Sequence, residues 1–202
     1  MNTENFRWKL SAILAQMEMA LDDEATEAFE RFQTMVYAQN ATMNLTAIKE
    51  TDSSLLNFAD SLSALPYIEG ASTACDIGSG AGFPGVVLAI ARPGIRFTLM
   101  EPRKKRAAFL CDVVQELGLK NAKTVRMRAE EAGHDPEFRE RFDIVTARAL
   151  AAAPVLCEYA MPLLRVGGRL IAYKGTMQEE EKKRAQKAFT FLGGADTRTV
   201  DA

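Results

Sequence analysis

The sequence lacks long apolar runs and a strong excess of charge of either sign. Among its 202 residues, no window approaches the ~18 consecutive apolar residues of a membrane-spanning helix. The first eight residues meet charge every few positions and contain no apolar stretch, which argues against export. With 48% hydrophobic and 26% charged residues, the composition excludes disordered and collagen-like chains and is typical of one globular protein.

Cysteine and histidine are scarce as well. The three cysteines, Cys75, Cys111 and Cys157, lie far apart, and the chain has a single histidine. This pattern matches neither a disulfide framework nor the ligand spacing of a zinc site. We therefore expect reduced thiols, no metal and a cytoplasmic protein that does not associate with membranes.

The net charge of −2 argues against a protein that holds nucleic acid by its overall charge. The charge is uneven, however. Residues 1–50 carry four Lys/Arg against eight Asp/Glu, a net charge of −4, so the remaining residues carry a net charge of +2. Their basic residues are clustered, and these clusters are where a polyanion would bind.

The spacing of apolar residues predicts helices over 4–21, 23–39 and 52–65, and then a change of rhythm. From residue 72, predicted strands (73–77, 96–100, 123–127, 142–147 and 169–173) alternate with predicted helices (84–91, 103–117, 154–164 and 178–192). Such alternation is typical of an α/β fold with a mostly parallel sheet and helices on both faces. We expect residues 1–68 to form a helical cap and residues 69–202 the core, within one compact unit.

A glycine-rich turn follows the first predicted strand. Its Gly80-x-Gly82-x-x-Gly85 spacing matches the dinucleotide-binding fingerprint, and Glu101 ends the next strand, where a ribose-binding acid belongs. The match alone leaves NAD and S-adenosylmethionine (SAM) open as cofactors.

Two acidic positions favour SAM. Asp76 precedes the turn, where a carboxylate would repel a diphosphate but attract the ammonium and sulfonium of SAM. Glu130 and Glu131 follow the third strand, near the expected place of an adenine. The structural alternative for Asp76 is a cap of the turn or helix.

Seven motifs occur in one order at family-like spacing: Asn44–Ile48, Asp60–Leu62, Asp76–Gly85, Lys105-Arg106, Arg128–Glu131, Thr146–Ala149 and Lys174-Gly175. Together they resemble the bacterial small-subunit ribosomal RNA guanine-N7 methyltransferases, also called the glucose-inhibited division protein B family. The resemblance covers about residues 5–195. It implies a Rossmann-like class I SAM-dependent methyltransferase that modifies one guanine of 16S ribosomal RNA near the decoding site, as naked RNA or in the 30S subunit. S-Adenosylhomocysteine (SAH) would be the product.

The resemblance also implies site residues. Cofactor contacts fall on Gly78, Phe83, Ala129, Glu130 and Arg148, to which the motif adds Asp76, Gly80 and Glu101. In this family aspartate is commoner than glutamate at the position of Glu101. Guanine N7 has a lone pair and no proton to lose, so the reaction needs no general base, and Arg148 is expected to act by positioning the cofactor carboxylate or the guanine.

Basic residues around the expected cleft are the predicted RNA contacts. They are Arg103, Lys104, Lys105, Arg106 and Lys174, with Arg126 and Arg128 beside them.

Two features depart from the family. Asn57 stands where the family often has histidine; its amide can donate and accept hydrogen bonds but cannot titrate, so no proton-transfer role is expected there. Residues 193–200 indicate one weak strand at most, and we expect the family's last strands to be missing from the sheet. A monomer is expected.

Other functions remain open at this point. They are a SAM-dependent enzyme that acts on a small molecule or protein, a non-catalytic module that keeps the pocket, and, as the weakest alternative, an NAD-binding protein.

Overall fold

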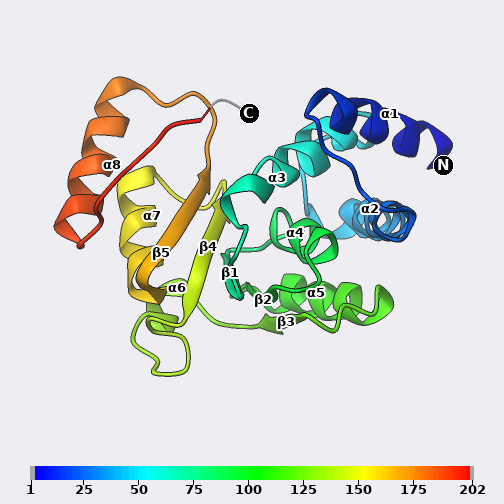
Figure 1. The fold of residues 1–202 in the computed structure, drawn as a ribbon. Coiled ribbons are helices and arrows are strands. Elements are labelled where there is room, and N and C mark those ends of the chain that lie inside the picture. The colour runs from blue at the N-terminus through cyan, green and yellow to red at the C-terminus, as the bar shows by residue number, and fades with distance from the viewer. Residues whose placement is uncertain (1–2, 201–202) are drawn as a thin grey trace.

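The computed structural model describes residues 3–200 and contains a five-stranded parallel sheet (Figure 1). The strands are β1 (Thr73–Ile77), β2 (Arg96–Met100), β3 (Ala122–Val125), β4 (Phe142–Arg148) and β5 (Leu164–Tyr173). Their order in space is β3-β2-β1-β4-β5, and each neighbouring pair is parallel. The predicted α/β class with a parallel sheet is confirmed.

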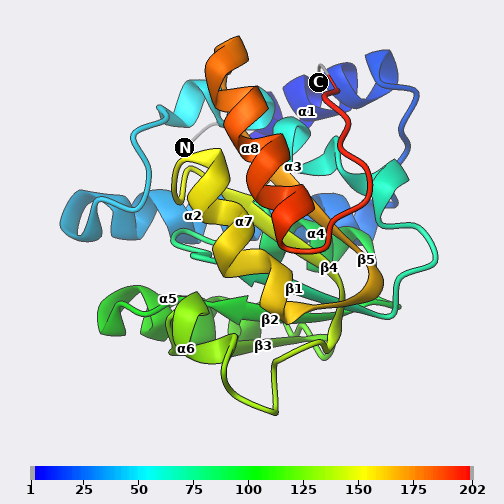
Figure 2. The same ribbon diagram turned by 90° about the vertical axis from the view of Figure 1, so that its left-hand side faces the viewer.

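Helices cover both faces of the sheet, as Figures 1 and 2 show from two directions. On one side lie α1 (Thr3–Gln16), α2 (Asp23–Met43), α3 (Asp60–Leu62), α4 (Gly85–Ala91) and α5 (Lys104–Glu116). On the other side lie α6 (Ala129–Ala132), α7 (Ala153–Ala160) and α8 (Glu179–Phe191), with α8 packed on the outside of α7. Short 3₁₀ turns occur at Glu50–Asp52, Leu65–Tyr67 and Met161–Leu163.

The alternation of side chains along the strands divides the core into two layers. In β1, Ala74 belongs to the cluster beneath α4, whereas its neighbour Cys75 belongs to the cluster beneath α7. In β4, Ile144 and Val145 divide in the same way. Both faces of the central strands β1, β2 and β4 are therefore buried, as is typical of a parallel sheet.

The N-terminal helices share the first of these clusters. Asp22 caps α2 by accepting a hydrogen bond from the Ala25 N–H at 2.7 Å. Phe29 and Phe32 of α2 are fully buried and meet the Phe58 ring edge-on, with centroids 5.4 and 5.9 Å apart. These contacts hold the N-terminal helices against the segment that leads into the sheet.

The segment predicted as one helix over 52–65 is helical but irregular. A 3₁₀ turn is followed by a π-helical stretch, Ser54–Ala59, and then by the single turn α3. Wider π turns are frequent at functional sites because they redirect backbone carbonyls and side chains. The periodicity of apolar residues does not reveal such a change of helix type.

Other boundaries also differ from the prediction. Helix α1 ends at Gln16 rather than near 21, and Glu18 takes a positive φ of 54° in the turn that follows. Helix α6 was not predicted, because its four residues are too few to show a helical period of apolar side chains. Strand β5 begins at Leu164, earlier than predicted, with a register shift against β4.

After α8, residues 195–200 contain no strand, so the described part of the sheet has β5 at its edge. None of the helices within residues 3–200 combines the length and apolar character needed to cross a bilayer.

Candidate functional site

The carboxyl ends of all five strands open onto one cleft of about 1150 Å³. Its wall includes the residues directly after β1, β2 and β3, the last residue of β4, and the end of β5: Gly78, Glu101, Arg126, Arg148, Tyr173 and Lys174. The N-terminal part contributes residues 45–48, Leu56 and Asp60. Strand order reverses between β1 and β4, which is where doubly wound sheets bind ligands.

The glycine turn between β1 and α4 forms the floor of the cleft. Gly78 and Gly80 have φ angles of +69° and +56°, a region that favours glycine, and both line the cleft. Gly85 serves packing instead, since a Cβ there would lie 2.6 Å from Leu99 Cδ2 and 2.7 Å from Asp76 Oδ2. The backbone of α4 can therefore approach the sheet closely.

Asp76 lies beneath the turn and is not among the residues that line the cleft. Its side chain is 1% exposed; Oδ1 accepts from the Thr146 hydroxyl at 2.8 Å and Oδ2 from the Gly85 N–H at 3.2 Å. Burial raises the pKa of Asp76 to about 6, although these hydrogen bonds favour the charged form and lower it. This carboxylate therefore accepts the first backbone N–H of α4 and is not among the residues that line the cleft. Its contact with a cofactor stays a prediction.

Glu101 does line the cleft, with 3% of its surface exposed. Its Oε2 accepts from the Gly80 N–H at 3.0 Å, and its Oε1 accepts from the Arg103 N–H at 2.8 Å. The carboxylate therefore joins the glycine turn to the end of β2. Each oxygen has a second lone pair for a ligand hydroxyl.

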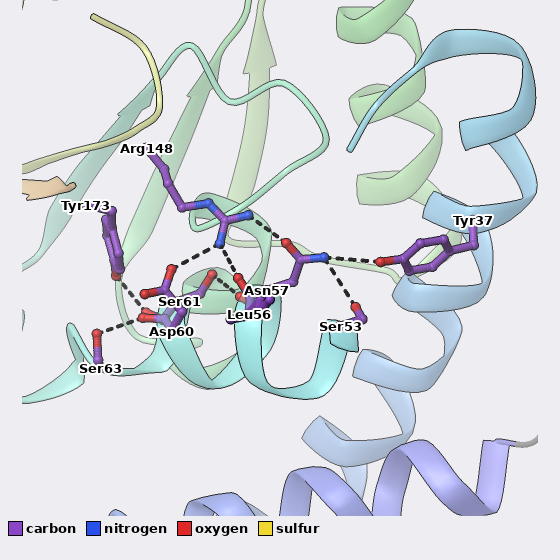
Figure 3. Close-up of polar contacts among 9 residues, drawn as sticks. All are labelled: Tyr37, Ser53, Leu56, Asn57, Asp60, Ser61, Ser63, Arg148 and Tyr173. Atoms are coloured by element: carbon purple, nitrogen blue, oxygen red, sulfur yellow. Dashed lines mark hydrogen bonds and ion pairs between the residues drawn. The ribbon is translucent and has the colours of Figure 1, made fainter. Parts of the chain in front are cut away.

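Arg148, at the end of β4, donates to three acceptors from the π-helical segment and α3 (Figure 3). One nitrogen, Nη1, donates to the Leu56 carbonyl and to Asp60 Oδ2, both at 3.1 Å, and Nη2 donates to Asn57 Oδ1 at 2.8 Å. The guanidinium carbon also lies 5.1 Å from the centre of the Phe83 ring. A guanidinium has five N–H donors, so Nε–H and one Nη2–H have no acceptor among residues 3–200.

Tyr173 lines the cleft together with Arg148, although it was not predicted from the sequence. Its hydroxyl donates to the Ser61 carbonyl at 2.7 Å (Figure 3), and burial raises the pKa of this hydroxyl well above its ordinary value. An aromatic residue at the end of a strand was the available signal, but it does not distinguish a cleft residue from a core residue.

After β3, the residues that line the cleft are not the ones that were predicted to contact the cofactor. Ala129 is buried and Glu130 is exposed, and neither lines the cleft, whereas their neighbours Arg128 and Glu131 do. Glu131 accepts a hydrogen bond from the Arg128 N–H and so closes the first turn of α6. Contacts of Ala129 and Glu130 with a cofactor stay predictions.

The predicted RNA-binding residues divide into three groups. Arg103, Arg106, Arg126 and Arg128 line the cleft, while Lys104 and Lys105 are exposed at the start of α5, outside it. Lys174 lines the cleft but pairs with Glu181 of α8 at 3.1 Å and donates to the Ala151 carbonyl at 3.2 Å. Four arginines at one opening make this side of the cleft suited to polyanions.

A family model described as rRNA small subunit methyltransferase G matches residues 25–202. A ribosomal RNA small subunit methyltransferase G from Acetivibrio thermocellus is 43% identical over 176 residues, which are 86% of this chain and 72% of that protein. One from Roseiflexus castenholzii is 43% identical over 188 residues, 92% of this chain and 80% of that protein.

Among solved structures, a SAM-dependent O-methyltransferase from Thermotoga maritima has a similar fold. It aligns with a TM-score of 0.55 and 18% sequence identity, covering 77% of this chain and 55% of that one. At this identity the likeness concerns the fold alone.

Proposed function

Because this chain belongs to the rRNA small subunit methyltransferase G family, we propose that it transfers a methyl group from SAM to N7 of a guanine in 16S ribosomal RNA. The observation that carries the proposal is a cleft at the β1–β4 switch point that joins a glycine turn, a buried acid and a partly unpaired arginine, with arginines at its opening.

The residues present fit SAM better than a dinucleotide. A diphosphate would bind the first backbone N–H groups of the helix after the glycine turn, but Asp76 already accepts from the Gly85 N–H there. A second negative group at that place would be repelled. Glu101 offers acceptors for ribose hydroxyls, and Arg148 offers two N–H donors for a carboxylate.

SAM, when bound, supplies a methyl group on a positively charged sulfur. The protein's part is to hold and align the reactants, since guanine N7 has no proton to remove. Arg148 binds the cofactor carboxylate or the guanine, and Phe83 and Tyr173 give the cleft apolar walls that exclude water. None of these steps calls for a side chain that gains or loses a proton.

The substrate is proposed to be RNA, either naked 16S ribosomal RNA or the 30S subunit. Arg103, Arg106, Arg126 and Arg128 would hold its phosphates at the opening of the cleft, and the exposed Lys104 and Lys105 would extend that surface. The target base would leave its stack to reach the cleft. A ribosomal substrate also makes a cytoplasmic location part of the proposal.

The proposal is tested by incubating the full chain with methyl-labelled SAM and 30S subunits, or deproteinised ribosomal RNA, from a strain that lacks the modification. We expect label in 16S RNA, found as 7-methylguanosine after nuclease digestion. An Arg148→Ala variant should lower the rate at least tenfold, since it removes the positioning group. SAM binding without transfer to either RNA would favour a different substrate, and no SAM binding would refute the proposal.

A further inference from the structure

Asn57 lies at the centre of a hydrogen-bond chain that connects two parts of the cleft wall. Its side chain is fully buried within the π-helical segment, and it does not itself line the cleft. Its Oδ1 accepts from Arg148 Nη2 at 2.8 Å, and its Nδ2 donates to the Tyr37 hydroxyl and to Ser53 Oγ, both at 3.3 Å (Figure 3). The amide thus bridges β4 and α2.

The direction of these hydrogen bonds is set by the neighbours. The Tyr37 hydroxyl donates a hydrogen bond to the Ile48 carbonyl at 3.0 Å. Because its one O–H is used there, its oxygen acts as the acceptor for Asn57. If the amide were turned over, its NH₂ group would face the N–H donors of Arg148 and its oxygen would face the oxygen of Tyr37. Neither contact would then be a hydrogen bond. Tyr37 therefore keeps the oxygen of Asn57 turned toward Arg148.

The same chain reaches the other wall of the cleft, because Ile48 belongs to the loop at residues 45–48 that lines it. Asp60, the charged partner of Arg148, has 38% of its side chain exposed and is open to competition from water. Asn57 is the fully buried acceptor. Its hydrogen bond is therefore the more rigid anchor for the guanidinium.

We infer that Asn57 is a positioning residue that, together with Tyr37, holds Arg148 so that its two unpaired N–H donors remain available to the carboxylate of the cofactor. This inference rests on the proposed function. It assigns Asn57 a part in cofactor affinity through hydrogen bonding, with no proton transfer. Removing the amide oxygen lets the guanidinium turn away or rearrange, and the ligand carboxylate loses its paired contact.

The test compares two ligands for the full chain by calorimetry: SAH, which carries the carboxylate, and 5′-methylthioadenosine, which lacks the amino-acid part. Asn57→Leu should weaken SAH binding about tenfold and leave 5′-methylthioadenosine binding within a factor of two. Tyr37→Phe should weaken SAH binding about threefold, and the double variant should be no worse than Asn57→Leu alone, because both changes act on one chain.

Two further variants complete the test. Asn57→Asp keeps an acceptor for Arg148 and should retain most of the preference for SAH, whereas Tyr67→Phe, a tyrosine outside the network, should behave as wild type. An equal loss for both ligands, or an unchanged preference in Asn57→Leu, overturns the inference while the proposed function stands. A wild-type chain that binds neither ligand overturns both.

Discussion

Asp76 is the residue at which burial and function are most closely linked. A carboxylate beneath the glycine turn stabilises the entry into α4 through the Gly85 N–H, yet burial makes its ionisation unfavourable. The raised pKa of Asp76 therefore makes its contribution to stability depend on pH.

The pKa of Asp76 rises from 3.8 in the unfolded chain to about 6 in the folded protein. Between these pH values Asp76 holds a proton in the folded state that it has lost in the unfolded chain. The contribution of Asp76 to the free energy of unfolding therefore falls as the pH rises from about 4 to 6 and is constant above pH 6. The change amounts to about 3 kcal/mol at most, at about 1.4 kcal/mol per pKa unit. Asp76→Asn, whose amide can still accept from Gly85 and donate to Thr146, should abolish it.

Urea unfolding at a series of pH values between 4 and 7.5 measures this difference. The stability of Asp76→Asn relative to wild type should increase with pH across that window. A difference that does not depend on pH would show that Asp76 ionises normally in the folded protein.

Gly85 has no room for a side chain. A methyl group there would lie 2.6 Å from Leu99 Cδ2 and 2.7 Å from the Asp76 side chain, so these buried neighbours or the start of α4 would have to shift. Gly85→Ala should lower the free energy of unfolding by about 2 kcal/mol, measured by chemical denaturation. Gly94→Ala is the matched control, since no atom lies within 4 Å of its added Cβ.

Asp143 of β4 joins this strand to β1 at the end of the sheet opposite the cleft. Its Oδ2 accepts from the Ser72 and Thr73 N–H groups, both at 2.8 Å, and from the Thr73 hydroxyl at 3.0 Å, while Oδ1 pairs with Arg165. Burial favours the neutral acid, but these hydrogen bonds and the Arg165 charge outweigh it and lower the pKa of Asp143.

Asp143→Ala leaves two backbone donors at the start of β1 without their acceptor. The free energy of unfolding should fall by about 2–3 kcal/mol, and the loss relative to wild type should shrink in acid, because a lowered pKa means stabilisation that disappears on protonation. Asp112→Ala, an exposed acid on α5, serves as the control. SAH affinity should stay unchanged, and a weakened affinity would contradict the separation of the two ends of the sheet.

Helix α8 is joined to the cleft by one acid. Glu181 accepts from the Ala153 N–H at the start of α7 at 3.1 Å and pairs with Lys174. The helix that closes the outer layer thus also holds a basic residue of the cleft wall, so Lys174 is not a free phosphate contact in this structure.

The distribution of charge over the protein determines how it binds RNA. The net charge is −2, yet basic side chains gather around the cleft and on the first turn of α5. Attraction to a polyanion must therefore be local and sensitive to salt.

The double variant Lys104→Ala/Lys105→Ala tests that view. Binding to 16S RNA should weaken, and the slope of log K against log salt should become shallower by about 1.5, the value for two lost phosphate contacts. The double variant Lys183→Ala/Arg184→Ala, on the exposed face of α8, should leave the slope unchanged. An equal change of the slope in both double variants would mean that RNA binding depends only on the net charge of the protein.

The alternation of strands and helices, the parallel sheet and the glycine turn could all be predicted from the sequence. These depend on local periods and on the backbone freedom of residues such as Gly78 and Gly80, both of which are readable along the chain. The family motifs depend on local spacing in the same way, and the family is confirmed.

Which side chains face the cleft could not be predicted in this way and depends on the folded arrangement of the elements. Asp76 turns inward, Lys174 is paired with Glu181, and Arg148 is held by Asn57, a residue 91 positions earlier in the chain. The direction of a side chain and the partner of a charge depend on elements that meet only when the chain folds. No local pattern encodes them, because the free energy of a buried hydrogen bond depends on all the groups that close around it.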